Sequence, residues 1–266
     1  MSADEVARVS DPCSYAKTRV GTPCHVWPAL LLSILVSALC YIAAGPTLGL
    51  FFGTFLLVTL IVPVLQSGDA TLRGAANIAI GTCAGAGIVW VCAATQPDVY
   101  LSDCAKSLLV LGAYVLALLG IGAMLLRIGL APVAVHTTTI ALGLAWLSWP
   151  VWLSPALESA HGQAIVDVLV PAHPLFCVNG VMKQFGAWDH YPGLAYPTLT
   201  VLNQDVAYRL PTSIVPAVVL QGIGGLVMLF FCARWTDRRS PSGPRHVRGH
   251  MADESATPGG VKAHGR

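Results

Sequence analysis

Residues 20 to 68 read VGTPCHVWPALLLSILVSALCYIAAGPTLGLFFGTFLLVTLIVPVLQSG and contain no Lys, Arg, Asp or Glu. A soluble domain rarely leaves such a length uncharged, because charged residues supply about a quarter of its composition. The hydrocarbon core of a bilayer, about 30 Å thick, instead requires roughly 20 mostly apolar residues per helix. This run is long enough for two such helices, and Gly45-Pro46 predicts a tight turn between them.

Four further runs lack charged residues, and each is long enough for one crossing: 74–97, 107–126, 128–157 and 210–233. We therefore predict an all-α, polytopic integral membrane protein with six transmembrane helices. The predicted helices are 26–44, 47–66, 74–95, 107–126, 131–153 and 211–233.

The composition agrees with this class. Apolar residues make up 55% of the 266 residues and charged residues 11%, with a mean hydropathy of +0.67. Around a membrane domain at 26–233 we expect an N-terminal segment, 1–25, and a basic C-terminal tail, 234–266. The tail has so few apolar residues that we expect it to be disordered. The mixed charges of residues 1–25 favour a retained first helix over a cleaved signal peptide.

Basic residues predict the orientation. With the N-terminus inside, twelve of the 15 Lys and Arg residues fall in inner segments, and only Lys106, Lys183 and Arg209 fall outside. Cytoplasmic segments of membrane proteins carry an excess of Lys and Arg. We therefore predict that both termini are cytoplasmic, in the inner (plasma) membrane of the cell.

Small residues recur at four-residue intervals in two predicted helices. Gly45, Gly49 and Gly53 share one helix face, as do Gly81 and Gly85. Such spacing allows two helices to approach closely. The stripes indicate packing within the bundle, with a dimer face or a sliding face as the alternatives.

Polar side chains inside apolar runs are candidate binding residues, because burying them in hydrocarbon is costly unless they have partners. The fifth predicted helix contains His136, Thr137 and Thr138, followed by Thr139. His136 could relay protons, or it could bond a neighbouring helix while the threonines bond their own carbonyls. Asn77 and Gln221 are further candidates for bonds between helices.

The outer segment, 154–210, is the one connection long enough to have structure of its own. Apolar stretches alternate with prolines and aromatic residues, a pattern typical of short interfacial or re-entrant helices. We expect a cap over the outer mouth of the bundle, with His173, Asn179 and Trp188 as candidate binding residues.

Little in the sequence supports a metal centre or an enzyme. His173 and Cys177 are four residues apart, with Asp189 and His190 nearby, but structural zinc sites usually show paired ligands at short intervals. A disulfide between Cys104 and Cys177 is possible if the outer side is oxidising. No catalytic motif is present. We expect no metal, no cofactor and no nucleic-acid partner.

The layout resembles the membrane subunit of an ABC-2-type transporter, with six spans, both termini inside and a long outer connection after the fifth span. The stretch His173-Pro174-Leu175-Phe176-Cys177-Val178-Asn179-Gly180 looks like the Asn-Pro-Leu-aromatic turn of that family, with His in place of the usual Asn. The resemblance implies a separate ATP-binding subunit, because the chain has no Walker A sequence. It also implies two copies that line one pathway.

Three functions therefore remain open. The first is a permease-like transport subunit that works with a cytoplasmic ATPase subunit. The second is a non-transporting membrane scaffold or assembly factor that binds partners through the outer cap and the basic tail. The third is an intramembrane enzyme or redox protein that uses His136, His173 or Cys177.

Overall fold

The computed structural model describes residues 26–45, 47–66, 71–95, 99–158, 161–182 and 209–239. Every regular element in these residues is helical. The predicted N-terminal segment, most of the basic tail and the second half of the outer cap lie outside the described residues. Trp188, Asp189 and His190 are among the positions left out.

Four helices are long and apolar enough to cross a membrane: α2 (Val26–Ala44), α4 (Leu72–Ala93), α5 (Leu101–Arg127) and the segment Val215–Arg234. Two shorter apolar helices, α3 (Leu48–Leu65) and α6 (Pro132–Leu147), occupy the places of the second and fifth predicted spans. The described residues thus contain four candidate spanning helices, which indicates a helical membrane protein.

The outward face of α2 has the character of a lipid-facing surface. Trp27, Leu31, Leu35 and Leu39 follow one another at four-residue intervals, and each is more than half exposed. A contiguous apolar surface of this kind is rare in soluble monomers and marks a membrane or partner interface.

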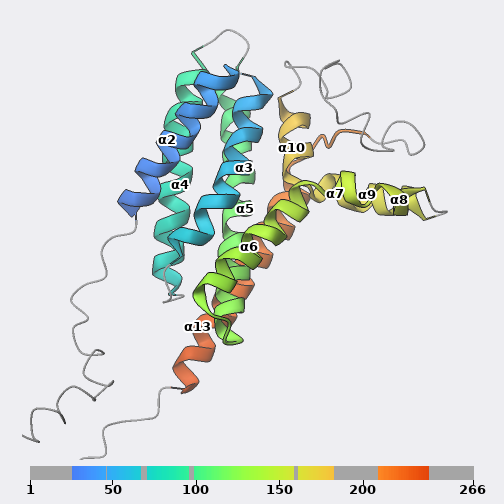
Figure 1. The fold of residues 1–266 in the computed structure, drawn as a ribbon. Helices are drawn as coiled ribbons and strands as arrows, with labels where there is room; N and C mark the ends of the chain where they lie inside the picture. Colours follow the sequence, from blue (N-terminus) through green and yellow to red (C-terminus); the bar gives the residue numbers. More distant parts are fainter. Residues whose placement is uncertain are drawn as a thin grey trace, which may run out of the picture.

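Helix α5 is central in the bundle and packs against α3, α4, α6 and α13 (Figure 1). Helices α2 and α4 share the most extensive contact among the described helices, and α4 carries glycine where α2 approaches. A Cβ atom at Gly81 would lie 2.6 Å from the Val26 carbonyl oxygen, and one at Gly85 would lie 2.6 Å from that of Leu30. The glycine stripe of α4 therefore serves packing within one chain.

Helix α5 begins at Leu101, six residues before the predicted start of the fourth span. Asp103 and Lys106 therefore lie in the first two turns of the helix, where the predicted boundary had placed them in a loop. An acidic residue in the first turn is favourable, because the helix dipole places partial positive charge there.

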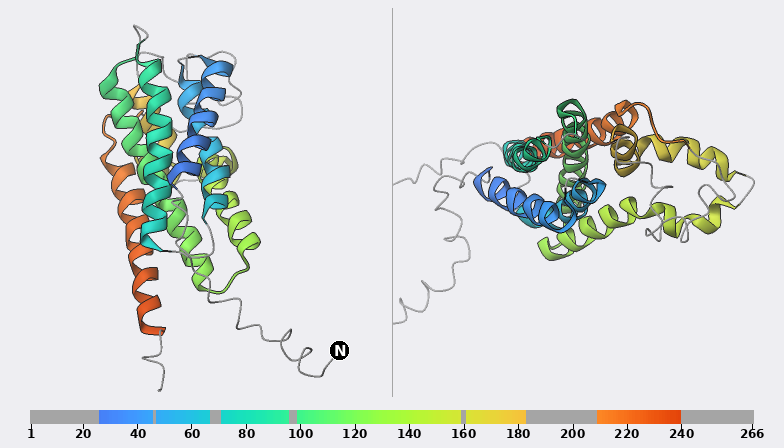
Figure 2. Two further views of the ribbon diagram at one scale, coloured as in Figure 1. Left: turned by 90° about the vertical axis from the view of Figure 1, so that its left-hand side faces the viewer. Right: turned by 90° about the horizontal axis from the view of Figure 1, so that it is seen from above.

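The predicted span 131–153 is too long, because α6 ends at Leu147. The sequence Ser148-Trp149-Pro150 follows, and Pro150 has no N–H with which to continue the helical bonding. The chain continues through α7 (Trp149–Trp152), α8 (Ser154–Leu157), α9 (Gly162–Ala172) and α10 (Pro174–Val181). Helices α7 to α9 project to one side of the bundle, as the view from above shows (Figure 2).

The last span contains a wider turn. It consists of α12 (Val215–Ala217), the π-helix η4 (Val218–Ile223) and α13 (Gly224–Arg239). Helix α13 therefore continues six residues beyond the predicted end of the sixth span. It packs on α5 where Gly225 of α13 lies against Gly120 of α5. A Cβ atom added at either glycine would collide with the backbone of the other helix.

Candidate functional site

The candidate site is the junction between α9 and α10, which we call the elbow (Trp146, Trp149, Ala172, His173, Pro174, Phe176, Cys177, Asn179 and Gln221). Helices α9 and α10 are both apolar and meet at an angle of 69°. Pro174 occupies the first turn of α10, where its missing N–H costs no helical bond. A bend of this kind leaves backbone groups without helical partners, and the surrounding side chains supply replacements.

His173 caps α10. Its Nδ1 accepts a hydrogen bond from the Phe176 N–H at 3.4 Å, three residues into the helix, where the side-chain oxygen of an Asn or Asp cap would accept. Its Nε2 lies 3.1 Å from the Trp146 carbonyl oxygen. Because Nδ1 accepts, Nε2 carries the proton and donates, which assigns the neutral tautomer.

The His173 side chain is completely buried, and it lies at the bend between α9 and α10, a pair that is long and apolar enough for a membrane span when taken together. The hydrogen-bond geometry of its two ring nitrogens assigns the neutral form of the ring.

The carbonyl groups at the end of α6 explain why His173 has an acceptor there. Within a continuing helix the Trp146 carbonyl would bond the N–H four residues on, but that residue is Pro150, which has none. The Ala145 carbonyl accepts from Trp152 Nε1 at 2.8 Å, and the Leu144 carbonyl accepts from Ser148. Side chains thus complete the end of α6.

Aromatic rings enclose His173. The ring centroids of Phe176, Trp146 and Trp149 lie 5.0, 5.7 and 6.1 Å from the centroid of the imidazole. These contacts exclude water from His173 and stabilise its neutral form. His173 is therefore a structural residue of the elbow rather than an exposed proton carrier.

Two further donors satisfy the end of α9. Gln221 Nε2 donates to the Ala172 carbonyl oxygen at 2.7 Å, and Cys177 Sγ donates to the Pro171 carbonyl oxygen at 3.2 Å. Because Gln221 belongs to η4, its bond fastens the elbow to the last span.

Several buried polar atoms of the elbow have no hydrogen-bond partner within the described part of the chain. They are Asn179 Oδ1 and Nδ2, Gln221 Oε1 and Trp149 Nε1. Buried polar atoms are normally paired, and exceptions are often sites of water or ligand binding. The elbow thus combines a broken helix with unused hydrogen-bonding capacity.

No family model matches this chain. Neither a curated protein nor a solved structure matches it.

The structure brings two of the predicted binding residues to the α9–α10 bend: His173 lies at the bend, and Gln221 donates to Ala172, the residue before it. Asn179 lies in α10. His136 belongs to a different contact, where its Nε2 lies 3.4 Å from the Gln66 carbonyl oxygen at the end of α3. Thr137 bonds the carbonyl oxygen of Val133 in its own helix. Both contacts are hydrogen bonds to backbone carbonyl oxygens. They match the structural role that the sequence left open for His136 and the threonines beside proton relay.

Asn77 and Thr138 are half-buried on α4 and α6, and neither belongs to the elbow. Trp188 lies outside the described residues. Cys104 and Cys177 are both free thiols, so the possible disulfide is not formed. Within the described ranges, no three His, Cys, Asp or Glu side chains come close enough to hold a metal ion.

Sequence reasoning missed a polar contact in the middle of the bundle. The hydroxyl groups of Thr59 and Tyr114 lie 2.7 Å apart, and Tyr114 donates to the Gly143 carbonyl oxygen at 3.4 Å. Gln66 joins α3 to α5 through the Leu119 carbonyl oxygen at 3.0 Å. The sequence did hold a signal for these contacts, because Thr59, Gln66 and Tyr114 are polar residues inside charge-free runs.

Proposed function

We propose that this protein is a permease-like subunit of a membrane transport system and that it works with a separate ATP-binding subunit. The observation that carries the proposal is the elbow, a helix pair bent by 69° and fastened to the last span by Gln221. Many transporters build their pathways around discontinuous helices, because broken helices expose backbone groups and allow movement. Gln221 also lies in a π-helix, a feature frequent at functional sites.

The proposed topology has six crossings, with both termini in the cytoplasm. Helices α3 and α6 are apolar and complete the crossings as shorter helices, and α9 and α10 form a re-entrant pair. Non-helical backbone is tolerated at membrane depth where protein covers it, and His173, Cys177 and Gln221 provide that cover. The proposed location is the inner (plasma) membrane, and the proposed assembly is a homodimer.

The proposal is tested by photo-crosslinking in intact membranes from two matched positions. Ile128, between α5 and α6, is 68% exposed, and Val168, on α9, is 69% exposed. A photo-reactive residue at Ile128 is expected to capture an ATP-binding protein, and one at Val168 is expected not to. Capture of no ATP-binding protein at Ile128, with the chain purified as a stable monomer, would refute the transport assignment.

A scaffold is the second candidate, and the projecting segment from α7 to α9 favours it. This segment extends from the bundle (Figure 2). Its side chains Val151, Trp152 and Val168 are exposed. An exposed apolar surface of this kind suits protein partners as well as lipid. If the photo-reactive residue at Val168 captures a protein and the one at Ile128 captures none, the result would favour the scaffold over the permease.

A further inference from the structure

A separate cleft lies at the end of the bundle where α5 begins and α10 ends. It has a volume of about 440 Å³, which is in the usual range for small-ligand sites. Its lining combines a cation, two hydroxyl groups and small or apolar residues: Lys106, Gly180, Val181, Thr212, Ser213 and Ile214. None of these residues takes part in the hydrogen bonds of the elbow.

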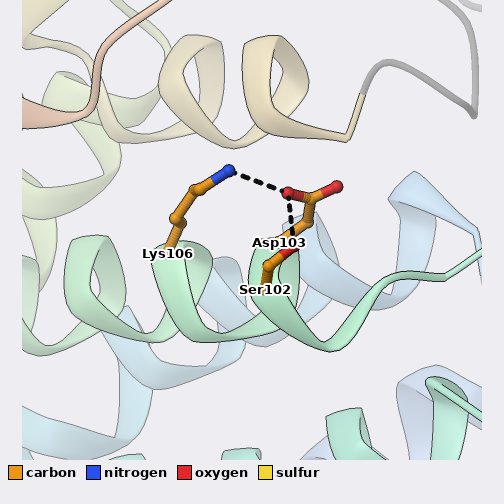
Figure 3. Close-up of polar contacts among 3 residues, drawn as sticks. All are labelled: Ser102, Asp103 and Lys106. Atoms are coloured by element: carbon orange, nitrogen blue, oxygen red, sulfur yellow. Dashed lines mark hydrogen bonds and ion pairs between the residues drawn. The ribbon is translucent and has the colours of Figure 1, made fainter.

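The cation is held in place by a neighbouring carboxylate. Lys106 Nζ lies 3.0 Å from Asp103 Oδ1, one turn earlier in α5, and Ser102 Oγ donates to the same oxygen at 3.3 Å (Figure 3). The Asp103 side chain is 12% exposed, whereas that of Lys106 is 51% exposed. The ammonium group is therefore the accessible partner, and it extends from α5 toward α10 (Figure 3).

The opposite wall supplies neutral donors. Thr212 and Ser213 are both exposed. Ser213 Oγ accepts a bond from the Val215 N–H at 3.2 Å, which leaves its own O–H available to donate. Gly180 lets the walls approach, because a Cβ atom there would collide with the Pro211 carbonyl oxygen. Arg209, also exposed, precedes Thr212 by three residues in the chain.

We infer that this cleft binds a phosphate group, with the Lys106 ammonium as its counter-charge and the Thr212 and Ser213 hydroxyls as additional donors. A phosphate group offers several acceptor oxygens, and charge-assisted hydrogen bonds are the strong ones. Phosphate reaches the cleft either as a phospholipid headgroup or as the free ion. Lys106 lies near a helix end, where long basic side chains of membrane proteins extend toward headgroups. The inference does not depend on the transport assignment.

The test uses the full chain in an uncharged detergent. Phosphatidylglycerol with a fluorescent acyl chain is titrated against the protein, and anisotropy gives the dissociation constant. Saturable binding is expected, and Lys106→Gln is expected to weaken it about tenfold, because a bond to a charged group is lost. Lys106→Arg is expected to retain most of the affinity. The matched control is Arg234→Gln in α13, which removes a cation that lies over the Phe230 ring instead of in the cleft.

The neighbouring carboxylate gives a test in the opposite direction. Asp103→Asn keeps an acceptor for Lys106 but removes a negative charge that repels phosphate, so binding should strengthen about threefold. Thr212→Val is expected to weaken binding less than Lys106→Gln, and it serves as the second variant if Lys106→Gln fails to fold.

Competition identifies the source of the phosphate. Displacement of the lipid by inorganic phosphate would assign the cleft to the free ion, and resistance to displacement would assign it to the lipid headgroup. The inference is overturned if neither probe binds saturably. It is also overturned if folded Lys106→Gln and Thr212→Val both bind as the unmodified protein does.

Discussion

His173 donates its Nε2 proton to the carbonyl oxygen of Trp146, 3.1 Å away and 27 residues earlier in the chain. This carbonyl needs a donor because Pro150 cannot provide one. The imidazole therefore completes the end of α6 through one nitrogen and caps the start of α10 through the other. A movement of α6 that separates these atoms would also disturb the cap, so the two helices are expected to move as a unit.

The two bonds of His173 can be separated by substitution. His173→Ala removes both and leaves a cavity among three aromatic rings, and we expect a loss of about 3 kcal/mol in the free energy of unfolding. His173→Asn keeps a capping acceptor and should recover about 1 kcal/mol of that loss. Unfolding in mixed micelles with increasing denaturing detergent measures both variants. Equal stability of the two variants would contradict the capping role.

The absence of charge was sufficient to predict the helices, because lipid forbids charged residues along a whole crossing. It did not predict their ends. Charge-free residues can also lie in short helices or turns that protein covers, which is why the predicted span 131–153 ran past the true end of α6 at Leu147. At the fourth span the predicted helix was too short instead. Lys106 was placed in a loop because it is charged, but it lies in the first turns of α5.

The candidate site was only half visible in the sequence. His173 and Gln221 stood out as polar residues among apolar ones. Their acceptors are backbone carbonyl oxygens of Trp146 and Ala172, and every residue carries such a group. Which carbonyl is free depends on where a helix breaks and which helix lies beside it. That information comes from packing between distant segments and not from local pattern.

Two glycines of α4 provide a matched test of the α2–α4 contact. A Cβ atom at Gly85 would lie 2.6 Å from the Leu30 backbone oxygen, whereas one at Gly87 would lie 3.3 Å from the flexible end of the Leu108 side chain. Gly85→Ala should therefore destabilise the protein by about 2 kcal/mol through overpacking. Gly87→Ala should be neutral or slightly stabilising, because alanine is the better helix former. Thermal unfolding in detergent compares them, and equal effects would refute the close backbone contact between α2 and α4.

Gln221 predicts a local effect at the elbow. Gln221→Met keeps the length of the side chain but leaves the Ala172 carbonyl oxygen without its donor, and we expect a cost of about 1 kcal/mol. Because the lost bond joins η4 to the end of α9, the loosening should concentrate in α9 and α10. Hydrogen exchange of backbone amides, followed by mass spectrometry, should show faster exchange in 162–181 and little change in α2.

Gln66→Met is the matched control for Gln221→Met. Gln66 also donates to one backbone carbonyl oxygen, that of Leu119, and its Oε1 is also unpaired within the described residues. That variant should leave exchange in 162–181 unchanged, because its bond joins α3 to α5. If both variants accelerate exchange in the elbow equally, the effect is general destabilisation and Gln221 does not fasten α9 to the last span.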